Sequence, residues 1–225
     1  MNNLQIVQQY VSEIKGNGIA YKVSKPVHTF HFSVPEVAPW TYTVTKTNYI
    51  HPLAELIYRI NPKVYGVIGV LAGTMESSLL QLYTNLNLQK IVICDIDLAD
   101  FVPGRDMGSY AYRNICGTNY GNFQGEFIYI RADSTKTKSI DTLGPYDLFF
   151  VDGQHEKTAV YKDMETAWRN LTPNGVILVH DIDLTSSSVR EGYDNWIQQH
   201  EKEIDHIEIS NDKFFLGLGI VVKKF

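Results

Sequence analysis

YDLFFVDGQH at Tyr146–His155 is followed further along the chain by NGVILVHDID at Asn174–Asp183. Each stretch contains a short apolar run that ends directly in an acid, Asp152 in the first and Asp181 in the second. Apolar runs of about four to eight residues, bounded by turn residues, are typical of strands buried in the middle of a sheet. The two stretches therefore predict two buried strands, each with a carboxylate at its carboxyl end.

A helix is expected between these strands. Apolar residues recur there at the spacing of one helix face: Val160, Met164, Ala167, Trp168 and Leu171. TPNG at residues 172–175 then predicts the end of the helix and a turn. A strand–helix–strand crossover joins parallel strands, so Asp152 and Asp181 are expected at the same edge of the sheet. Ligands of open α/β sheets bind at this edge.

The same alternation extends in both directions along the chain. Expected strands lie at residues 64–70, 90–94, 127–130, 146–151, 175–180, 206–209 and 215–222, with helices at 53–60, 77–86, 110–115, 160–171 and 189–197. A tight turn at residues 210–212 separates the last two strands, which predicts an antiparallel pair. The sequence thus predicts an α/β protein with a Rossmann-like, mostly parallel seven-stranded sheet, a C-terminal antiparallel β-hairpin and helices on both faces.

The first 50 residues do not follow this alternation. Leu4–Ile14 is predicted to form a short amphipathic helix, whereas Tyr21–Tyr49 is rich in Thr, Val and aromatic residues and contains three prolines. That composition indicates irregular or edge-strand structure. We therefore expect an N-terminal cap or extension over residues 1–50 and one α/β domain over residues 51–225.

The bulk composition limits the class of protein. A hydrophobic content of 44% with 20% charged residues is typical of a globular domain, and the net charge of −5 argues against a nucleic-acid partner. The N-terminus lacks the pattern of a signal peptide, and no run approaches about 18 apolar residues, so no membrane association is expected. Cys94 and Cys116 are not spaced as a metal-binding pair and indicate reduced thiols in a cytoplasmic protein.

The two acid-bearing stretches resemble the class I S-adenosylmethionine-dependent methyltransferases. The similarity is strongest to a branch with an Asp-Gly-x-His motif, here residues 152–155, and a Gly-x-x-x-x-His-Asp motif, here residues 175–181, with Asp163 and Trp168 on the intervening helix. This branch also contains proteins named cephalosporin hydroxylases. The resemblance covers about residues 64–225. The α/β domain expected over residues 51–225 is therefore interpreted as a methyltransferase-like domain. It implies an O-methyltransferase that acts on a hydroxyl of a small molecule or a sugar.

The run VIGVLAGT follows a predicted strand and begins a helix. Glycine lets the backbone approach a ligand closely, and a helix N-terminus offers free N–H groups. Of the family's acid-x-Gly-x-Gly-x-Gly pattern, Gly69 and Gly73 match, whereas Leu71 replaces the middle glycine and Val67 the acid. Glu76 is a candidate replacement carboxylate for the amino group of the cofactor. The alternative reading of this run is a plain strand-to-helix turn.

Acids also follow the next two predicted strands. Asp95 ends the first of them, where an acid can accept both ribose hydroxyls of a cofactor, with Asp97 as a nearby alternative. By the resemblance, Asp133 and Ser134 occupy the position from which family members hold the adenine; a helix cap is the alternative reading. The predicted set of S-adenosylmethionine-binding residues is Gly69, Gly73, Glu76, Asp95, Asp133, Ser134 and Asp152.

A divalent cation such as Mg²⁺ is the second predicted cofactor, because acids that converge on one sheet edge suit a hard cation with oxygen ligands. The predicted ligands are Asp152, Asp181 and Asp183. Some O-methyltransferases of this fold hold a metal with acids at these two strand ends, and by that resemblance Asp152 and Asp181 carry over. Ile182 fills the third expected position, which leaves Asp183 or His180 to substitute. Since extended residues alternate between faces, Asp181 and Asp183 are expected to point away from His180.

The predicted catalytic residues are Asp152, His155 and Asp181. A bound cation lowers the pKa of a hydroxyl and makes its oxygen a better nucleophile. The metal-free alternative uses His155 or His180 as a general base, because an imidazole titrates near neutral pH. Positioning of the two reactants contributes in either case.

Two other classes of protein remain as alternatives. A nicotinamide-dependent oxidoreductase is suggested by the Tyr-x-x-x-Lys sequences at Tyr21–Lys25 and Tyr42–Lys46, but both precede the glycine run, so chance spacing explains them. A non-catalytic methyltransferase-like binding or scaffold protein is suggested by the altered glycine run. The N-terminal aromatic residues are candidate substrate walls and leave open a homodimer; they are Phe30, Phe32, Trp40 and Tyr42.

Overall fold

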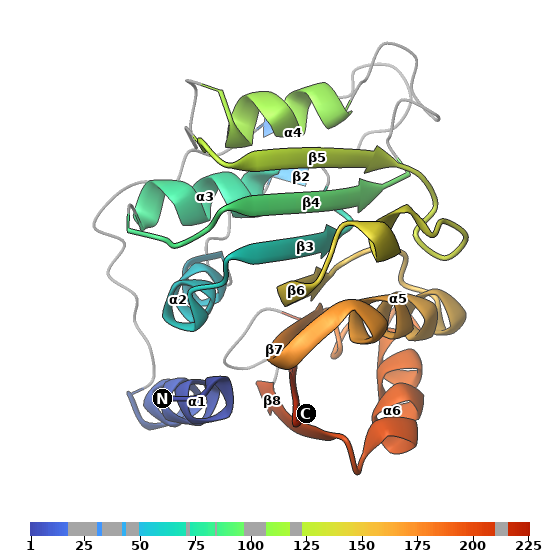
Figure 1. The fold of residues 1–225 in the computed structure, drawn as a ribbon. Helices are drawn as coiled ribbons and strands as arrows, with labels where there is room; N and C mark the ends of the chain where they lie inside the picture. The colour runs from blue at the N-terminus through green and yellow to red at the C-terminus, as the bar shows by residue number, and fades with distance from the viewer. Residues whose placement is uncertain are drawn as a thin grey trace.

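The computed structural model describes residues 1–17, 31–32, 42–43, 50–70, 73–83, 85–96, 107–117, 123–209 and 216–225. The predicted aromatic walls Phe30 and Trp40, the alternative acid Asp97 and the hairpin turn at residues 210–212 lie outside these ranges. Within them, the chain folds around one large sheet with helices on both faces (Figure 1).

The large sheet has seven strands in the order β5-β4-β3-β6-β7-β9-β8. The strands are β3 (Val64–Ile68), β4 (Lys90–Asp95), β5 (Glu126–Arg131), β6 (Tyr146–Val151), β7 (Leu171–His180), β8 (Ile204–Ile209) and β9 (Leu218–Lys223). Neighbours among β3 to β7 pair in parallel, whereas β9 runs antiparallel to both β7 and β8. The predicted seven-stranded, mostly parallel sheet with an antiparallel C-terminal pair is confirmed.

Helices cover the sheet in two groups. They are α1 (Asn3–Asn17), α2 (Ile50–Ile60), α3 (Thr74–Leu82), α4 (Met107–Ile115), α5 (Lys157–Asn170), α6 (Val189–His200) and the short 3-10 helix η2 (Ser139–Thr142). Buried residues of α1 to α4 form one core cluster with one face of the sheet, and those of η2, α5 and α6 form a second cluster with the other. Since strand residues alternate between faces, β6 supplies Leu148 and Phe150 to the first cluster and Phe149 and Val151 to the second.

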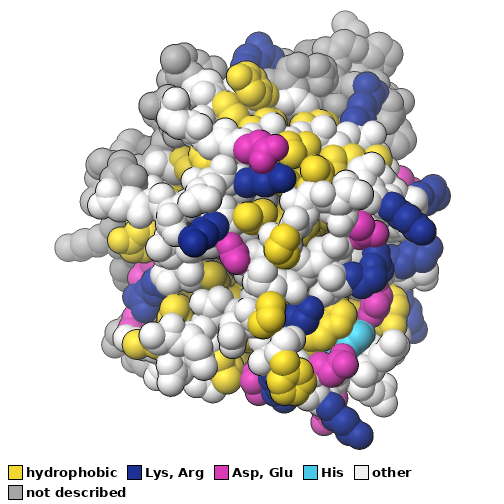
Figure 2. All heavy atoms as spheres, viewed as in Figure 1, with side chains coloured by type: hydrophobic (Ala, Val, Ile, Leu, Met, Phe, Trp, Pro, Cys, Tyr) yellow, Lys and Arg dark blue, Asp and Glu magenta, His cyan; other side chains and the backbone are white. Residues whose placement is uncertain are grey.

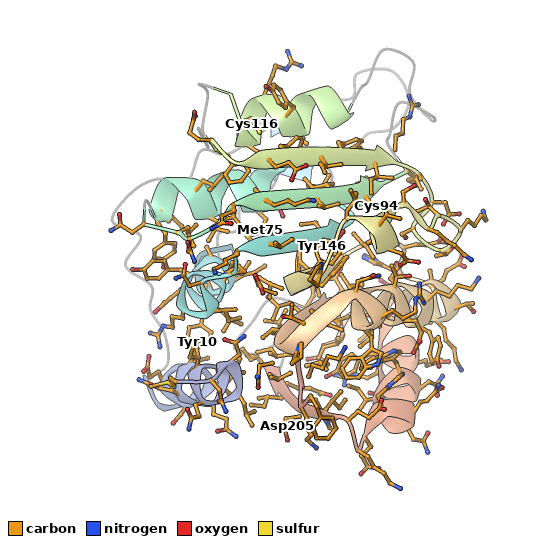
Figure 3. All side chains as sticks on the ribbon, viewed as in Figure 1. Tyr10, Met75, Cys94, Cys116, Tyr146 and Asp205 are labelled. Carbon is orange, nitrogen blue, oxygen red and sulfur yellow. The ribbon has the colours of Figure 1, made fainter. Side chains whose placement is uncertain are left out.

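The N-terminal helix α1 is part of the first core. Val7 and Tyr10 are fully or almost fully buried, and the Tyr10 hydroxyl donates a hydrogen bond to the carbonyl of Pro52 at 2.6 Å. Figure 3 shows Tyr10 pointing from α1 toward the rest of the molecule. Between α1 and α2, the structure describes a two-stranded antiparallel pair, β1 (His31–Phe32) and β2 (Tyr42–Thr43).

The expected turn at residues 172–175 is corrected by the structure. Helix α5 ends at Asn170 and β7 begins directly at Leu171, so this segment belongs to an irregular strand whose register shifts where it pairs with β6. Asn174 takes a left-handed backbone conformation with φ of 60°, which asparagine tolerates better than most residues. A side chain on Gly175 would lie 2.5 Å from Leu171 Cγ, so the irregular strand packs tightly against its own start.

Charged side chains of both signs are interspersed over the face shown in Figure 2, without a single-sign field. Among the helices of the described residues, none combines the length and the apolar character that a membrane span requires.

Candidate active site

The glycine turn and the Asp152 turn touch at the carboxyl edge of the sheet. Gly69 follows β3 with a left-handed φ of 78°, and its N–H donates to the carbonyl of Cys94 at 3.0 Å. The N–H of Asp152 donates to the carbonyl of Ile68 at 2.9 Å. A β-carbon on Gly69 would lie 2.1 Å from the carbonyl oxygen of Asp152, so only glycine fits this contact.

Gly73 closes the same turn and begins α3. It has a left-handed φ of 70°, and its N–H donates to the carbonyl of Val70 at 3.0 Å. A β-carbon there would lie 2.9 Å from Ile115 Cδ1 of α4. The two glycines that match the family pattern therefore occupy backbone positions that favour glycine, while Leu71 lies outside the described residues.

Asp95 ends β4 beside this turn. Its Oδ2 atom accepts a hydrogen bond from the N–H of Val70 at 2.7 Å. The predicted ribose acid thus fixes the glycine turn to the end of the neighbouring strand. Asp95 ends β4, the glycine turn follows β3 and Asp152 follows β6, and these three strands are neighbours in the sheet.

Asp133 and Ser134 lie beyond the end of β5. The Oδ1 atom of Asp133 accepts hydrogen bonds from the N–H and the hydroxyl of Thr135, and its Oδ2 atom lies 2.6 Å from Lys136 Nζ. These hydrogen bonds from Lys136 and Thr135 lower the pKa of Asp133. The Asp133 carboxylate therefore stabilises its own turn, which is not the start of a helix. Ser134 instead neighbours Asp163, whose pKa is raised to about 7 by burial, and the Ser134 hydroxyl offsets part of that rise.

Glu76 is a buried carboxyl in the first turn of α3. Its side chain is 2% exposed, and the hydroxyl of Tyr65 donates to its Oε1 atom at 3.3 Å. Burial raises the pKa of Glu76 to about 7, and the nearby Asp152 contributes to the rise. Tyr65 packs in the same core cluster as Val67, the residue that stands where the family has an acid. The α3 carboxyl thus lies on the sheet face that a Val67 acid would use.

Two acids and two histidines form a cluster where β6 and β7 end. His180 Nδ1 lies 2.9 Å from Asp181 Oδ1 and 3.4 Å from Asp152 Oδ1. His155 Nε2 lies 3.1 Å from Asp181 Oδ2 and 4.0 Å from Asp152 Oδ1. The parallel pairing of β6 with β7 confirms that both acids follow strands ending at one edge.

The charges in this cluster compensate one another. Hydrogen bonds to Asp152 and Asp181 raise the pKa of His155 to about 9. Burial by itself would lower the pKa of His180, but the same two carboxylates raise it. Burial would likewise raise the pKa of Asp181, but the two histidines lower it. The cluster therefore favours protonated imidazoles beside an ionised Asp181.

The backbone at Asp181 breaks the alternation that the sequence suggested. Strand β7 ends at His180, and Asp181 takes a left-handed φ of 62°. This conformation brings the Asp181 carboxylate next to the His180 ring, whereas an extended strand would send the two side chains to opposite faces. Aspartate is among the few residues that tolerate this region. The expectation that His180 points away from Asp181 was wrong.

Asp183 does not join the cluster, which corrects its prediction as a metal ligand. Its Oδ1 atom lies 2.6 Å from Arg190 Nη2 of α6, so the carboxylate forms an ion pair. Its backbone N–H donates to the carbonyl of Leu216 at 2.8 Å. Because the backbone leaves the extended conformation at Asp181, Asp183 lies against α6 and the segment before β9.

One group in the described part of the chain brings three acid or imidazole atoms within 4.8 Å of one another: Asp152, His155 and Asp181. The sequence predicted both acids as ligands but His155 only as a catalytic residue. Two oxygens and one imidazole nitrogen suit a divalent transition metal such as Mn²⁺ better than they suit Mg²⁺. The signal for His155 was its place three residues after Asp152, in the turn between β6 and α5.

Two functional candidates escaped the sequence interpretation. The sequence does not single out Arg190, because no local pattern shows that a helix arginine pairs with Asp183 and Glu208. Asp163 was taken as structural; it is 1% exposed, and its Oδ2 atom would lie 3.3 Å from a β-carbon on Gly153. Among the described residues, neither oxygen of Asp163 makes a hydrogen bond of ordinary geometry, although the Ser134 hydroxyl lies close enough to affect its pKa.

The strand order and the carboxyl-edge site are those of a class I methyltransferase fold. The sequence profile of a family described as a methyltransferase domain matches residues 67–182, more than half of the chain. The chain belongs to this methyltransferase family, which confirms the predicted class of enzyme. Comparison with curated protein sequences gives no match.

Solved structures share the fold at low sequence identity. The O-methyltransferase from Bacillus cereus in complex with SAH is 15% identical with a TM-score of 0.56, over 98% of this chain and 91% of that one. TomG from Streptomyces achromogenes, an O-methyltransferase in complex with SAM, is 14% identical with a TM-score of 0.57, over 77% and 78%. The SAH-bound Podospora anserina methyltransferase PaMTH1 is 18% identical with a TM-score of 0.55, over 77% and 76%. At these identities the likeness shows the fold.

Proposed function

We propose that the protein is an S-adenosylmethionine-dependent O-methyltransferase that acts on a hydroxyl of a small molecule or a sugar. The observation that carries this proposal is the contact between the glycine turn and the Asp152 turn, at the sheet edge where the Asp–His cluster begins. A methyl donor held over Gly69 would have its reactive end next to that cluster. The solved O-methyltransferases of this fold with SAM or SAH support the choice of donor.

The binding roles follow from the placement of the polar groups. In this proposal the turn from Gly69 to Gly73 approaches the methionine part, and the Glu76 carboxylate takes its ammonium group. Asp95 accepts the ribose hydroxyls at the end of β4. Asp133 and Ser134 border the adenine, with Ser134 the better placed of the two because Lys136 and Thr135 already occupy Asp133.

The reaction needs an acceptor hydroxyl in line with the methyl group and a way to remove its proton. The oxygen forms a bond to the methyl carbon as the sulfur–carbon bond breaks, leaving S-adenosylhomocysteine. His155 is the accessible member of the cluster, with its side chain 41% exposed. Asp181 orients the ring through Nε2, so the atom that can take the hydroxyl proton is Nδ1. A divalent cation bound by Asp152, Asp181 and His155 would instead lower the pKa of the hydroxyl.

The two forms of the mechanism place different demands on the cluster. A base whose pKa is raised to about 9 carries a proton at neutral pH, so the free imidazole is scarce. The carboxylates that hold this proton are hard oxygen ligands, and a cation would compete with the proton for them. Metal dependence therefore separates the two forms of the mechanism.

Titration calorimetry and a product assay test the proposal. We expect S-adenosylmethionine and S-adenosylhomocysteine to bind and NAD to give no heat. Incubation with S-adenosylmethionine, Mn²⁺ and a panel of catechols, phenols and sugars should yield S-adenosylhomocysteine and an acceptor that is 14 mass units heavier, the mass of CH₂. Loss of this product with EDTA indicates the metal-assisted form. Binding of NAD alone would favour an oxidoreductase, and silence for all three ligands a scaffold.

The cellular setting is part of the proposal. Cys94 is buried at the carboxyl end of β4 and Cys116 follows α4, and the two are free thiols (Figure 3). Free thiols fit the reducing cytoplasm that the sequence suggested. The proposed partners remain a small-molecule or sugar substrate and, in an oligomer, a second copy of the chain.

A further inference from the structure

Arg190 of α6 binds three acids and a carbonyl at the end of β7. Its guanidinium meets Asp183 Oδ1 at 2.6 Å, Glu208 Oε2 at 2.9 Å and Asp194 Oδ1 at 3.4 Å. Its Nε–H donates to the carbonyl of Ile182 at 3.0 Å. The side chain is about one third exposed, so it joins α6, β8 and the segment after β7 without being fully buried.

The segment that Arg190 holds is the turn directly after Asp181. The N–H of Leu184 donates to the carbonyl of Asp181 at 3.0 Å, which closes the turn, and the N–H of Asp183 donates to Leu216. Gly217 packs against it so closely that a β-carbon there would lie 2.7 Å from Asp183 Oδ2. The turn is therefore fixed on one side by α6 and on the other by the start of β9.

The left-handed backbone of Asp181 depends on what holds this turn. A non-glycine residue in that region is strained and persists only when its surroundings impose it. The two contacts of Arg190 lie one and two residues after Asp181, at the Ile182 carbonyl and the Asp183 carboxylate. They fix the direction in which the chain leaves Asp181, and hence the place of its carboxylate beside His180 and His155.

We propose that Arg190 is a positioning residue that keeps the Asp181 carboxylate in the cation-binding cluster by fixing the Ile182–Asp183 turn. The inference rests on the proposed metal-assisted function and assigns Asp183 to the support of the site. Arginine suits this role because its planar fork reaches two carboxylates and a carbonyl at fixed angles, which a lysine ammonium does not.

Arg190→Lys tests the proposal, because it keeps the positive charge and removes the planar guanidinium group with its several N–H donors. The matched control is Asp194→Asn, which removes the longest of the three carboxylate contacts and leaves those to Asp183 and Glu208 intact. Each variant is titrated with Mn²⁺ alone and, separately, with S-adenosylhomocysteine. Amide hydrogen exchange of Asp183, Leu184 and Val70 is followed by NMR without metal. Thermal unfolding checks that each variant is folded.

For Arg190→Lys we expect Mn²⁺ to bind about 10- to 100-fold more weakly, the usual effect of losing a group that orients a metal ligand. The amides of Asp183 and Leu184 should exchange at least about tenfold faster, while Val70 exchange and S-adenosylhomocysteine affinity stay within about twofold. Asp194→Asn should match the wild type in every measurement. A general loss of structure would also speed the exchange of the Val70 amide and weaken S-adenosylhomocysteine binding, so it would not reproduce this pattern.

Unchanged exchange at Asp183 and Leu184 in a folded Arg190→Lys variant would overturn the positioning role. So would faster exchange with full Mn²⁺ affinity, because the turn would then be loose without consequence for Asp181. Should the wild type itself not bind Mn²⁺, the metal-assisted function fails. The claim that Arg190 positions a cation ligand is then refuted as well. The amide exchange rates of Asp183 and Leu184 then test only whether Arg190 fixes the turn.

Discussion

The carbonyl oxygen of Asp152 lies where a β-carbon on Gly69 would approach to 2.1 Å. This contact joins the loop that is proposed to hold the cofactor to the acid that begins the Asp–His cluster. A change at Gly69 should therefore affect cofactor binding and the position of Asp152 together. A change in the turn after β6 should likewise affect the glycine turn, since the N–H of Asp152 donates a hydrogen bond to the carbonyl of Ile68 in β3.

Gly69→Ala should destabilise the protein and abolish cofactor binding. The new methyl group meets backbone that cannot move aside cheaply, and φ of 78° is strained for alanine. We expect a loss of about 2 kcal/mol or more in the free energy of unfolding, measured by urea denaturation. Calorimetry with S-adenosylhomocysteine should show no heat at concentrations that saturate the wild type. The control Thr158→Ala, at an exposed position of α5, should change neither; binding by a folded Gly69→Ala variant would argue against the shared contact.

Much of the fold was predictable because it depends on local patterns. Runs such as Ile91–Cys94 and Phe149–Val151 are apolar over the length of a strand, and each is buried in the sheet. Acids directly after such runs must lie at the carboxyl edge of a parallel sheet. Asp95, Asp152 and Asp181 were found there by this rule alone.

The errors came from contacts between distant parts of the chain. The alternation rule failed at Asp181 because the left-handed backbone there is fixed by Arg190 and Leu216, which lie 9 and 35 residues further along. For the same reason the sequence predicts Asp183 as a ligand, although Asp183 forms an ion pair with Arg190 of α6. No local pattern marks an ion pair between a turn and a helix, so neither the ligand set nor the role of Arg190 could be derived from the sequence.

Asp181→Asn should remove the activity and leave cofactor binding intact. Asparagine keeps the size of the side chain but loses the charge that pairs with His155 and His180 and that would bind the cation. We expect turnover to fall at least about 100-fold, with S-adenosylhomocysteine affinity within about threefold of the wild type. Asp205→Asn is the matched control. Asp205 lies on β8 (Figure 3), at the level of Val176 in β7 and not at the end of β7 where the cluster lies, and it contacts Lys224 at 3.7 Å. Full turnover in Asp181→Asn would refute a role for this acid.

Glu76→Gln should weaken the binding of ligands that carry an amino-acid group. The proposed partner of Glu76 is the ammonium of the methionine part, so the neutral amide loses an ion pair in a buried setting. S-adenosylhomocysteine should bind about 10- to 100-fold more weakly to the variant by calorimetry. Methylthioadenosine lacks the amino-acid part and serves as the control ligand, so its affinity should not change. An equal loss for both ligands would indicate a structural role for Glu76 instead.

The stability of the wild type relative to Glu76→Gln should also depend on pH in a defined way. The pKa of Glu76 is raised from 4.5 to about 7 by burial, so the folded state favours the neutral acid. Its contribution to stability is complete below pH 4.5 and is lost as the pH rises through about 7. Relative to the variant, the wild type should therefore lose stability between about pH 5 and pH 8. Urea unfolding without cofactor at several pH values measures this difference, and a flat difference would exclude a raised pKa.

Asp163 offers a second pH-dependent prediction, from the other face of the sheet. Burial raises its pKa from 3.8 to about 7, Asp133 adds to the rise, and the hydroxyl of Ser134 offsets part of it. Because the raised value favours the neutral acid in the folded state, the contribution of Asp163 to stability is present below pH 3.8 and disappears as the pH passes about 7. Asp163→Asn fixes a neutral side chain of the same shape. At pH 8 it should be more stable than the wild type by about 2 to 4 kcal/mol.

The comparison of Asp163→Asn with the wild type isolates this group. Other titrating residues, including the Asp–His cluster, change both proteins alike and cancel in the difference between their free energies of unfolding. That difference should be small near pH 4 and grow toward pH 8, whereas Asp205→Asn should show no such trend. A carboxylate bonded to an ordered water or to backbone N–H groups would remain ionised at lower pH. In that case Asp163→Asn would be the less stable protein at pH 8, and Asp163 would belong among the groups that fix the Gly153 turn by accepting hydrogen bonds.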